Sequence, residues 1–132
     1  MINLLLDTHA FIWFMEDNPL LSRNAKRAIE NSLNNVFISI ASLYEIAIKL
    51  KGGKIGFDKP ISAFFNDISE YNLTLLPITE KHLIAYDNIP LILGHKDPFD
   101  RLIIATAITD DLSIVSVDNQ FNNYKDLVSI LW

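Results

Sequence analysis

Short apolar runs alternate along the chain with longer stretches in which apolar residues recur every three or four positions. The short runs are typical of strands covered on both faces, which need no polar alternation. They predict strands at residues 2–6, 36–40, 73–78, 112–117 and 127–132. The longer stretches predict helices at residues 9–16, 22–34, 41–50, 60–71, 79–88 and 98–110, with 89–94 left as an unassigned loop. This alternation predicts an α/β sandwich with a mainly parallel sheet and helices on both faces.

Polar residues mark the expected helix starts. Thr8 is expected to cap the first helix, and Asp97, followed by Pro98 at the first helical position, is expected to cap the sixth. Ser42 and Glu45 have the spacing of a capping box for the third helix. These starts place several polar side chains next to the ends of the predicted strands.

The composition fits one domain that buries part of its surface against another protein. We expect the 132 residues to form a single domain over residues 1–132. Hydrophobic residues make up 50% of the chain and the mean hydropathy is +0.23, which favours a dimer or a partner-bound protein. The net charge of -5 argues against a broad basic surface for nucleic acid. It does not exclude a nuclease whose metal-binding carboxylates are clustered.

The residue types also indicate the cellular compartment in which the protein is expected. The chain has no cysteine, which excludes a disulfide framework and a thiolate metal site. Its start, Met1-Ile2-Asn3, lacks the basic segment of a secretory signal, and its apolar runs are too short to span a bilayer. We therefore expect a cytoplasmic protein without a membrane partner.

Carboxylates gather at one edge of the predicted sheet. Asp7 and Asp118 each end an apolar strand, and Glu45 lies in the first turns of the helix after the second strand. Asp97 and Asp100 begin a helix that runs opposite to the strand after it, so its N-terminus lies at the same edge. In parallel α/β sheets the carboxyl ends of the strands form the ligand-binding crevice. We therefore expect the acids to converge there.

Acids that lie close together are expected to bind a cation, because the cation relieves their mutual repulsion. Two carboxylates about 5 Å apart repel by roughly 3 kcal/mol at an effective dielectric constant of about 20. That repulsion drives protonation unless a cation is present. Mg²⁺ or Mn²⁺, which bind carboxylates and water, would neutralise the group. Such an ion activates water and stabilises charge during displacement at phosphate, so the pattern favours phosphoryl chemistry.

The acids also have structural interpretations. Asp97 fits a helix cap, and Asp100 fits a first-turn acid favoured by the helix dipole. Glu45 fits the capping box of its own helix equally well. Asp7 and Asp118 are harder to explain without a function, although Asp118 could simply begin a turn.

Other polar and aromatic side chains also have both functional and structural interpretations. His9 and His95 are candidate general bases, although a single histidine near a helix start is more often a polar cap. Lys49, Lys51 and Lys54 fit a solvated helix end that could also guide phosphate. Four aromatic residues are expected in the core or at an interface, not as base-stacking platforms: Trp13, Phe64, Phe65 and Phe99.

Four segments together resemble the PIN domain, in its VapC-type toxin branch. They occur in order with suitable spacing and cover essentially the whole chain. The family's acids fall here on Asp7, Glu45, Asp100 and Asp118. The segments are Leu4-Leu5-Leu6-Asp7-Thr8-His9, Ser42-Leu43-Tyr44-Glu45-Ile46-Ala47-Ile48-Lys49, Asp97-Pro98-Phe99-Asp100-Arg101-Leu102-Ile103-Ile104-Ala105 and Ser116-Val117-Asp118-Asn119-Gln120-Phe121.

The resemblance implies a three-layer sandwich in which a five-stranded, mainly parallel sheet lies between helices. It implies endonucleolytic cleavage of RNA with Mg²⁺ or Mn²⁺ bound by the acids. Proteins of the VapC-type branch are toxins of type II toxin-antitoxin pairs, usually dimeric, and are silenced by a small antitoxin that covers helices near the active site. The implied partners are thus RNA, a cognate antitoxin and a second copy of the chain.

The resemblance also implies a role for each residue of the site. Asp7, Asp100 and Asp118 would bind the metal, and Glu45 would either bind it through water or position the attacking water. Ser116 keeps the hydroxyl of the threonine that the family commonly has two residues before its last acid. Supporting roles fall on three residues: Asp97, Thr8 and Ser116.

Two other functions are compatible with parts of the sequence. A PIN-like module without catalysis would hold RNA or a protein through the apolar first helix, but it would have no need to maintain four mutually repelling acids. A phosphatase of the haloacid type would use Asp7 as a nucleophile. That type has a second aspartate two residues on, where this chain has His9.

Overall fold

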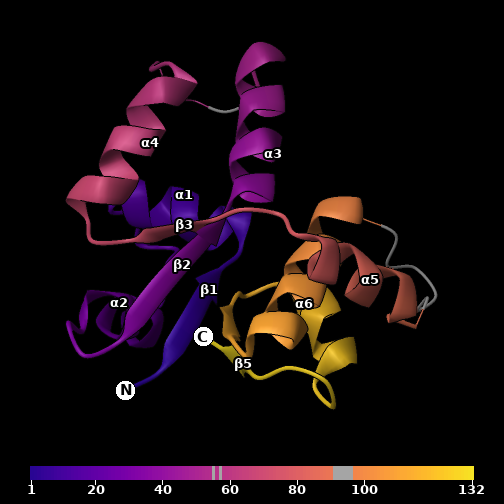
Figure 1. The fold of residues 1–132 in the computed structure, drawn as a ribbon. Coiled ribbons are helices and arrows are strands. Elements are labelled where there is room, and N and C mark those ends of the chain that lie inside the picture. The colour runs from indigo at the N-terminus through magenta and orange to yellow at the C-terminus, as the bar shows by residue number, and fades with distance from the viewer. Residues whose placement is uncertain (55, 57, 91–96) are drawn as a thin grey trace.

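The computed structural model describes residues 1–54, 56, 58–90 and 97–132. Its centre is a five-stranded sheet in the order β3-β2-β1-β4-β5, and every strand pair is parallel (Figure 1). The predicted five-stranded parallel sheet is therefore confirmed. The strands are β1 (Asn3–Leu6), β2 (Asn35–Ser39), β3 (Thr74–Leu76), β4 (Ser113–Val115) and β5 (Ile130–Leu131).

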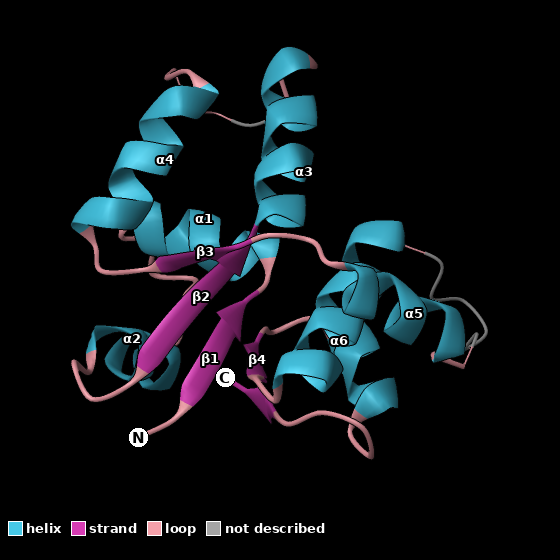
Figure 2. Ribbon diagram, in the orientation of Figure 1, coloured by secondary structure: helices cyan, strands magenta, loops and turns pink. Residues whose placement is uncertain are grey.

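Helices cover both faces of this sheet (Figure 2), so the three-layer sandwich is also confirmed. Residues of α1 to α4 form one layer, and residues of α5, α6 and the 3₁₀ helix η1 form the other. The helices are α1 (Thr8–Glu16), α2 (Arg23–Glu30), α3 (Ile40–Lys51), α4 (Ile61–Glu70), α5 (Glu80–Asn88), α6 (Pro98–Asp110) and η1 (Asn119–Tyr124). In the part of the chain that the structure describes, no helix is both long and apolar enough to cross a membrane.

The central strand β1 shows why its sequence is continuously apolar. Leu4, Leu5 and Leu6 are fully buried. Leu4 and Leu6 pack in the cluster beneath α1 to α4, whereas Leu5 packs with α6 on the opposite face. Successive side chains of a strand point to opposite faces, so a strand between two helical layers needs apolar residues at every position.

Strands β1 and β2 pass directly into the helices that follow them, and this corrects two predicted caps. Asp7, not Thr8, caps α1, because its Oδ1 accepts a hydrogen bond of 2.7 Å from the backbone N–H of Ala10. Ser39 caps α3 in the same way, through a hydrogen bond of 3.0 Å from the N–H of Ala41.

The predicted capping box of Ser42 and Glu45 is wrong. Helix α3 begins at Ile40, so Ser42 is its third residue and Glu45 its sixth, and the N–H of Glu45 is no longer one of the unpaired donors at the helix start. Their side chains meet Thr8 instead. By contrast, the predicted cap of α6 is confirmed, since Asp97 accepts from the N–H groups of the next turn and Pro98 is the first helical residue.

Several predicted elements are shorter than expected. Helix α2 ends at Glu30 and not at residue 34. Asn34 instead joins the turn to the first strand: its Oδ1 accepts from the N–H of Ile2 at 2.9 Å and its Nδ2 donates to the carbonyl of Ala28 at 2.9 Å. Strands β3, β4 and β5 are also shorter than predicted, and η1 was not predicted. In the unassigned loop, only residues 89 and 90 are described.

Candidate active site

Asp7 is fixed at the carboxyl edge of the sheet by α1 and by the end of the neighbouring strand β4. Its side chain is buried and caps α1, and its backbone N–H donates to the carbonyl of Val115 at the end of β4, at 3.1 Å. The Ser116 hydroxyl donates a hydrogen bond to the Asp7 carboxylate. It also accepts one of 3.0 Å from the N–H of Asp118. Ser116 therefore joins two of the expected acids, which come from opposite ends of the chain.

Glu45 is held by groups on both of its oxygens. The Thr8 hydroxyl donates to Glu45 Oε1 at 2.7 Å, and Lys49 Nζ lies 3.2 Å from Oε2. A hydroxyl has one hydrogen, so the 3.0 Å contact between Thr8 and Ser42 is one in which Ser42 donates. Thr8 and Ser42 are both buried, which fixes the orientation of the half-buried Glu45.

Asp97 and Asp100 begin α6, as predicted. Asp97 Oδ1 accepts from the N–H groups of Phe99 and Asp100 at 2.9 and 3.1 Å, so Asp97 is a helix cap. Arg101 is buried, and its two terminal nitrogens donate to the carbonyls of Ile89 and Pro90 at the end of α5, both at 3.2 Å.

Asp118 is exposed and its side chain begins η1. Its Oδ1 accepts a hydrogen bond of 2.9 Å from the N–H of Gln120. The turn interpretation of Asp118 is therefore correct for one of its oxygens. This cap still leaves the residue at the edge where Ser116 links it to Asp7.

The five acids act on one another electrostatically. Burial, together with the charges of Asp97, Asp118, Asp7 and Glu45, raises the pKa of Asp100 to about 7. Burial also raises the pKa of Asp7, and the charge of Asp118 adds to the rise, while hydrogen bonds from Ser116 and Ala10 and the charge of His9 oppose it. Acids after β1, within α3, at the start of α6 and after β4 thus share one electrostatic field.

The acids fit a hydrated cation better than a directly enclosed one. Within residues 1–54, 56, 58–90 and 97–132, no three His, Asp or Glu side chains lie close enough to hold a metal ion between them. Mg²⁺ usually keeps several waters and binds through one or two carboxylates, so a dedicated three-ligand cage is not required. The donors are all hard oxygen atoms, as Mg²⁺ and Mn²⁺ prefer.

The other candidates differ in where they lie. His9 is exposed beside Asp7, and its ring contacts Trp13 with 5.8 Å between centroids. His95 lies outside the described residues. Lys51 and Lys54 are exposed at the end of α3, beyond the Lys49 ion pair.

Sequence reasoning gave no supporting role to two polar residues, Ser42, which it assigned to a capping box, and Arg101. Ser42 supports Thr8, and Arg101 anchors the end of α5. The available signal was a polar side chain within an apolar helical stripe. That pattern indicates a buried hydrogen bond but does not name the partner.

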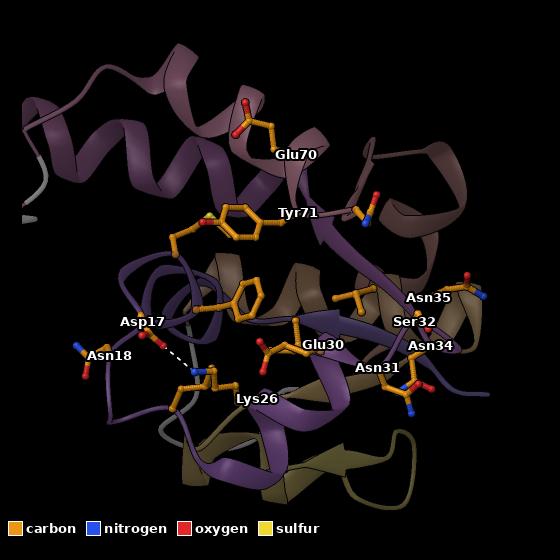
Figure 3. Close-up of a pocket in the computed structure, with 16 residues that line it drawn as sticks. Asp17, Asn18, Lys26, Glu30, Asn31, Ser32, Asn34, Asn35, Glu70 and Tyr71 are labelled. Carbon is orange, nitrogen blue, oxygen red and sulfur yellow. Dashed lines mark hydrogen bonds and ion pairs between the residues drawn. The ribbon is translucent and has the colours of Figure 1, made fainter.

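A hollow elsewhere contains none of the expected site residues. It has a volume of about 760 Å³ and lies between α1, α2 and the end of α4 (Figure 3). Its lining includes Asn35, where β2 begins, and Asn72, just before β3, so it lies at the amino edge of the sheet. The candidate site is at the opposite edge.

The fold and the gathered acids define a parallel α/β domain with a candidate cation site at its carboxyl edge. Residues 4–127 match the family described as the PIN domain. The chain therefore belongs to the PIN domain family, and the resemblance drawn from its motifs is confirmed.

The chain is similar to several VapC and VapBC proteins. Ribonuclease VapC22 of Mycobacterium tuberculosis (strain ATCC 25618 / H37Rv) is 27% identical over 125 residues, which are 95% of this chain and 94% of that protein. A chain of VapBC2 from Rickettsia felis, bound to a DNA fragment from their promoter, has a TM-score of 0.71 and 20% identity over 98% of both chains. A chain of DNA-bound VapBC from Salmonella typhimurium has a TM-score of 0.65 and 19% identity, over 99% of this chain and 98% of that one.

Proposed function

We propose that this chain, as a single PIN domain over residues 1–132, is a metal-dependent endoribonuclease and the toxin of a type II toxin-antitoxin pair. The observation that carries the proposal is the shared field of acids at the carboxyl edge, in which Asp100 has a pKa raised to about 7 by burial and by four other carboxylates. Such a group destabilises the fold unless a cation neutralises it. The similarity to a ribonuclease, VapC22, supports RNA as the substrate.

The proposed ligands of Mg²⁺ or Mn²⁺ are Asp7, Asp100 and Asp118, of which one or two bind the ion directly and the others bind through its waters. When bound, the ion supplies charge stabilisation at phosphate and a more acidic water. The chain's own hydrogen bonds position the ligands, since Ser116 holds Asp7 and the loop at Asp118 together. Burial of Asp7 keeps bulk water from competing for its carboxylate.

Glu45 is proposed either to bind the ion through water or to position the attacking water. Thr8 and Lys49 each engage one of its oxygens, at 2.7 and 3.2 Å. A carboxylate accepts more than one hydrogen bond per oxygen, so Glu45 retains capacity for a water. Thr8 is therefore the residue that aims Glu45, and Asp97 fixes the first turn that carries Asp100.

The proposed partners are a cognate antitoxin and a second copy of the chain. Complexes described as VapBC are among the structures with the same fold, which supports an antitoxin partner. Leu83 and Ile84 of α5 are 56% and 54% exposed, and adjacent exposed apolar residues favour burial against another protein chain. A protein that cleaves cellular RNA would act in the cytoplasm, which is the proposed location.

The proposal is tested by expressing the chain alone in a bacterium, as wild type and as Asp7→Asn. Asparagine caps a helix as well as aspartate does, so the variant should keep its fold while losing a ligand charge. Asp17→Asn is the matched control, because Asp17 ends α1 away from the acids. Growth arrest and new RNA ends are expected with wild type and Asp17→Asn only.

A PIN-like module that binds RNA or protein without catalysis is the second candidate. It is favoured by one observation: among the described residues, no three acidic or histidine side chains already surround an ion position. If wild type and Asp7→Asn are equally soluble and folded, and neither produces new RNA ends, this second function replaces the first.

A further inference from the structure

Two aromatic rings stand directly beside the candidate site. Tyr44 precedes Glu45 on α3, and Phe99 precedes Asp100 on α6. Their ring centroids lie 5.9 Å apart with an interplanar angle of 65°. The pair therefore bridges the two helices that supply these acids.

The two rings have different roles in this pair. At 65° they cannot both lie flat on the same planar group. Phe99 is half-buried, whereas Tyr44 is 63% exposed. Tyr44 is thus the ring with a free face, and Phe99 supports it in an edge-to-face contact.

A second aromatic pair has a similar geometry but lies away from the acids. Phe14 and Tyr71 also stand edge to face, with centroids 5.7 Å apart, and Tyr71 is 52% exposed. This pair lines the hollow at the amino edge, away from the acids (Figure 3). Of the two pairs, only Tyr44 and Phe99 adjoin the acids.

The charge of the protein indicates what a free ring at this position would do. The net charge of -5 argues against a broad basic surface that would hold RNA mainly by phosphate contacts. Aromatic stacking on bases does not depend on phosphate charge and tolerates every base. Single-stranded RNA, whose bases can turn outward, is the form of RNA that proteins read by stacking.

We propose that Tyr44, supported by Phe99, stacks on a base of single-stranded RNA next to the phosphate that is cleaved. This inference rests on the proposed ribonuclease function and adds a binding contact to it. It gives Phe99 a supporting role that its assignment to core or interface did not include. Tyr44 supplies affinity for the substrate and takes no part in the bond cleavage.

The test measures binding with and without bases. The probe is a fluorescein-labelled oligouridine strand of about 20 nucleotides, longer than a single stacking site requires, and an abasic strand of the same length. Anisotropy in Mg²⁺ gives the Kd of each strand for Asp7→Asn protein, which does not cleave. Tyr44→Ala, Tyr44→Phe and the matched control Tyr71→Ala are added to that background.

Tyr44→Ala should weaken binding of oligouridine by about 5- to 150-fold, the range for loss of one base–aromatic stack. It should leave the abasic strand unchanged, since that strand has nothing to stack. Tyr44→Phe and Tyr71→Ala should bind both strands as the parent does. With Asp7 intact, Tyr44→Ala should raise KM for oligouridine cleavage and leave kcat unchanged.

Equal effects of Tyr44→Ala on both strands, or no effect on either Kd or KM, would overturn the inference while the ribonuclease function stands. A change of molecular mass in light scattering, with RNA binding intact, would assign the ring to a protein interface and also overturn it. If wild-type protein neither binds nor cleaves RNA, the proposed function fails and this inference fails with it.

Discussion

Asp100→Asn should stabilise the metal-free protein and remove its response to metal. The pKa of Asp100 rises from 3.8 to about 7 in the fold. Each pKa unit corresponds to about 1.36 kcal/mol, so a rise of roughly 3 units sets a ceiling of about 4 kcal/mol. The carboxyl group is only half-buried, and solvent screening reduces this to roughly 2 kcal/mol.

The sign of the pH dependence follows from the direction of this shift. Between pH 3.8 and about 7 the folded protein keeps a proton on Asp100 that the unfolded chain has lost. Stability of the metal-free wild type therefore falls as pH rises through this window and stays low above it. Asp100→Asn has no such proton, so its advantage should be greatest at pH 8 and small near pH 4.

Urea unfolding in EDTA, followed by the fluorescence of Trp13 and Trp132, measures this difference at several pH values. At pH 8 the variant should be more stable by roughly 2 kcal/mol, which is about 6–10 °C in Tm for a chain of this size. Added Mn²⁺ should raise the Tm of wild type but hardly that of Asp100→Asn. Asp126→Asn, at an exposed position outside the site, should match wild type throughout.

Two results would refute this reasoning. A variant less stable than wild type in EDTA at pH 8 would mean that the Asp100 charge is compensated in the fold. An unchanged Mn²⁺ response in Asp100→Asn would mean that the ion does not use this carboxylate.

Two further predictions concern buried polar groups. Thr8→Val should lower RNA cleavage at least tenfold by releasing Glu45, and it should lower the free energy of unfolding by about 1–3 kcal/mol because Ser42 loses its acceptor. Thr8→Ser should restore both cleavage and stability. Cleavage by Thr8→Val equal to that of wild type would contradict the role of Thr8 in orienting Glu45. His82 is 2% exposed and bonds Asp110 at 2.9 Å. His82→Ala should therefore lower the free energy of unfolding in urea by about 2–4 kcal/mol and leave RNA cleavage at 20 °C unchanged. A loss of cleavage without a loss of stability would instead place His82 in the site.

The sheet and the edge where the acids gather could be predicted because they follow from patterns along the chain. The short run Leu4-Leu5-Leu6 is typical of a strand between two layers, and it packs in that way. Strand-terminal acids of a parallel sheet lie at one edge by topology. The positions of Asp7 and Asp118 were therefore accessible without coordinates.

The contacts that finish the site could not be predicted, because they depend on which strands are neighbours. Ser116 reaches Asp7 only because β4 lies next to β1, and no local pattern specifies that order. The end of α2 was misplaced for a similar reason, since Asn34 bonds the N–H of Ile2. The predicted caps of α1 and α3 were wrong because Asp7 and Ser39 each follow or end a strand and also cap the next helix. Rules based on residue spacing do not anticipate a residue with both positions.

The pairing of β1 with β4 also determines when the site can form during synthesis of the chain. Asp7 is among the first residues made, but its N–H binds Val115 and its carboxylate binds Ser116. The acids therefore cannot be held together until nearly the whole chain has left the ribosome, because a domain cannot close contacts with residues not yet made. Prematurely ended chains lack this closure, so an interrupted translation would release fragments without the assembled site.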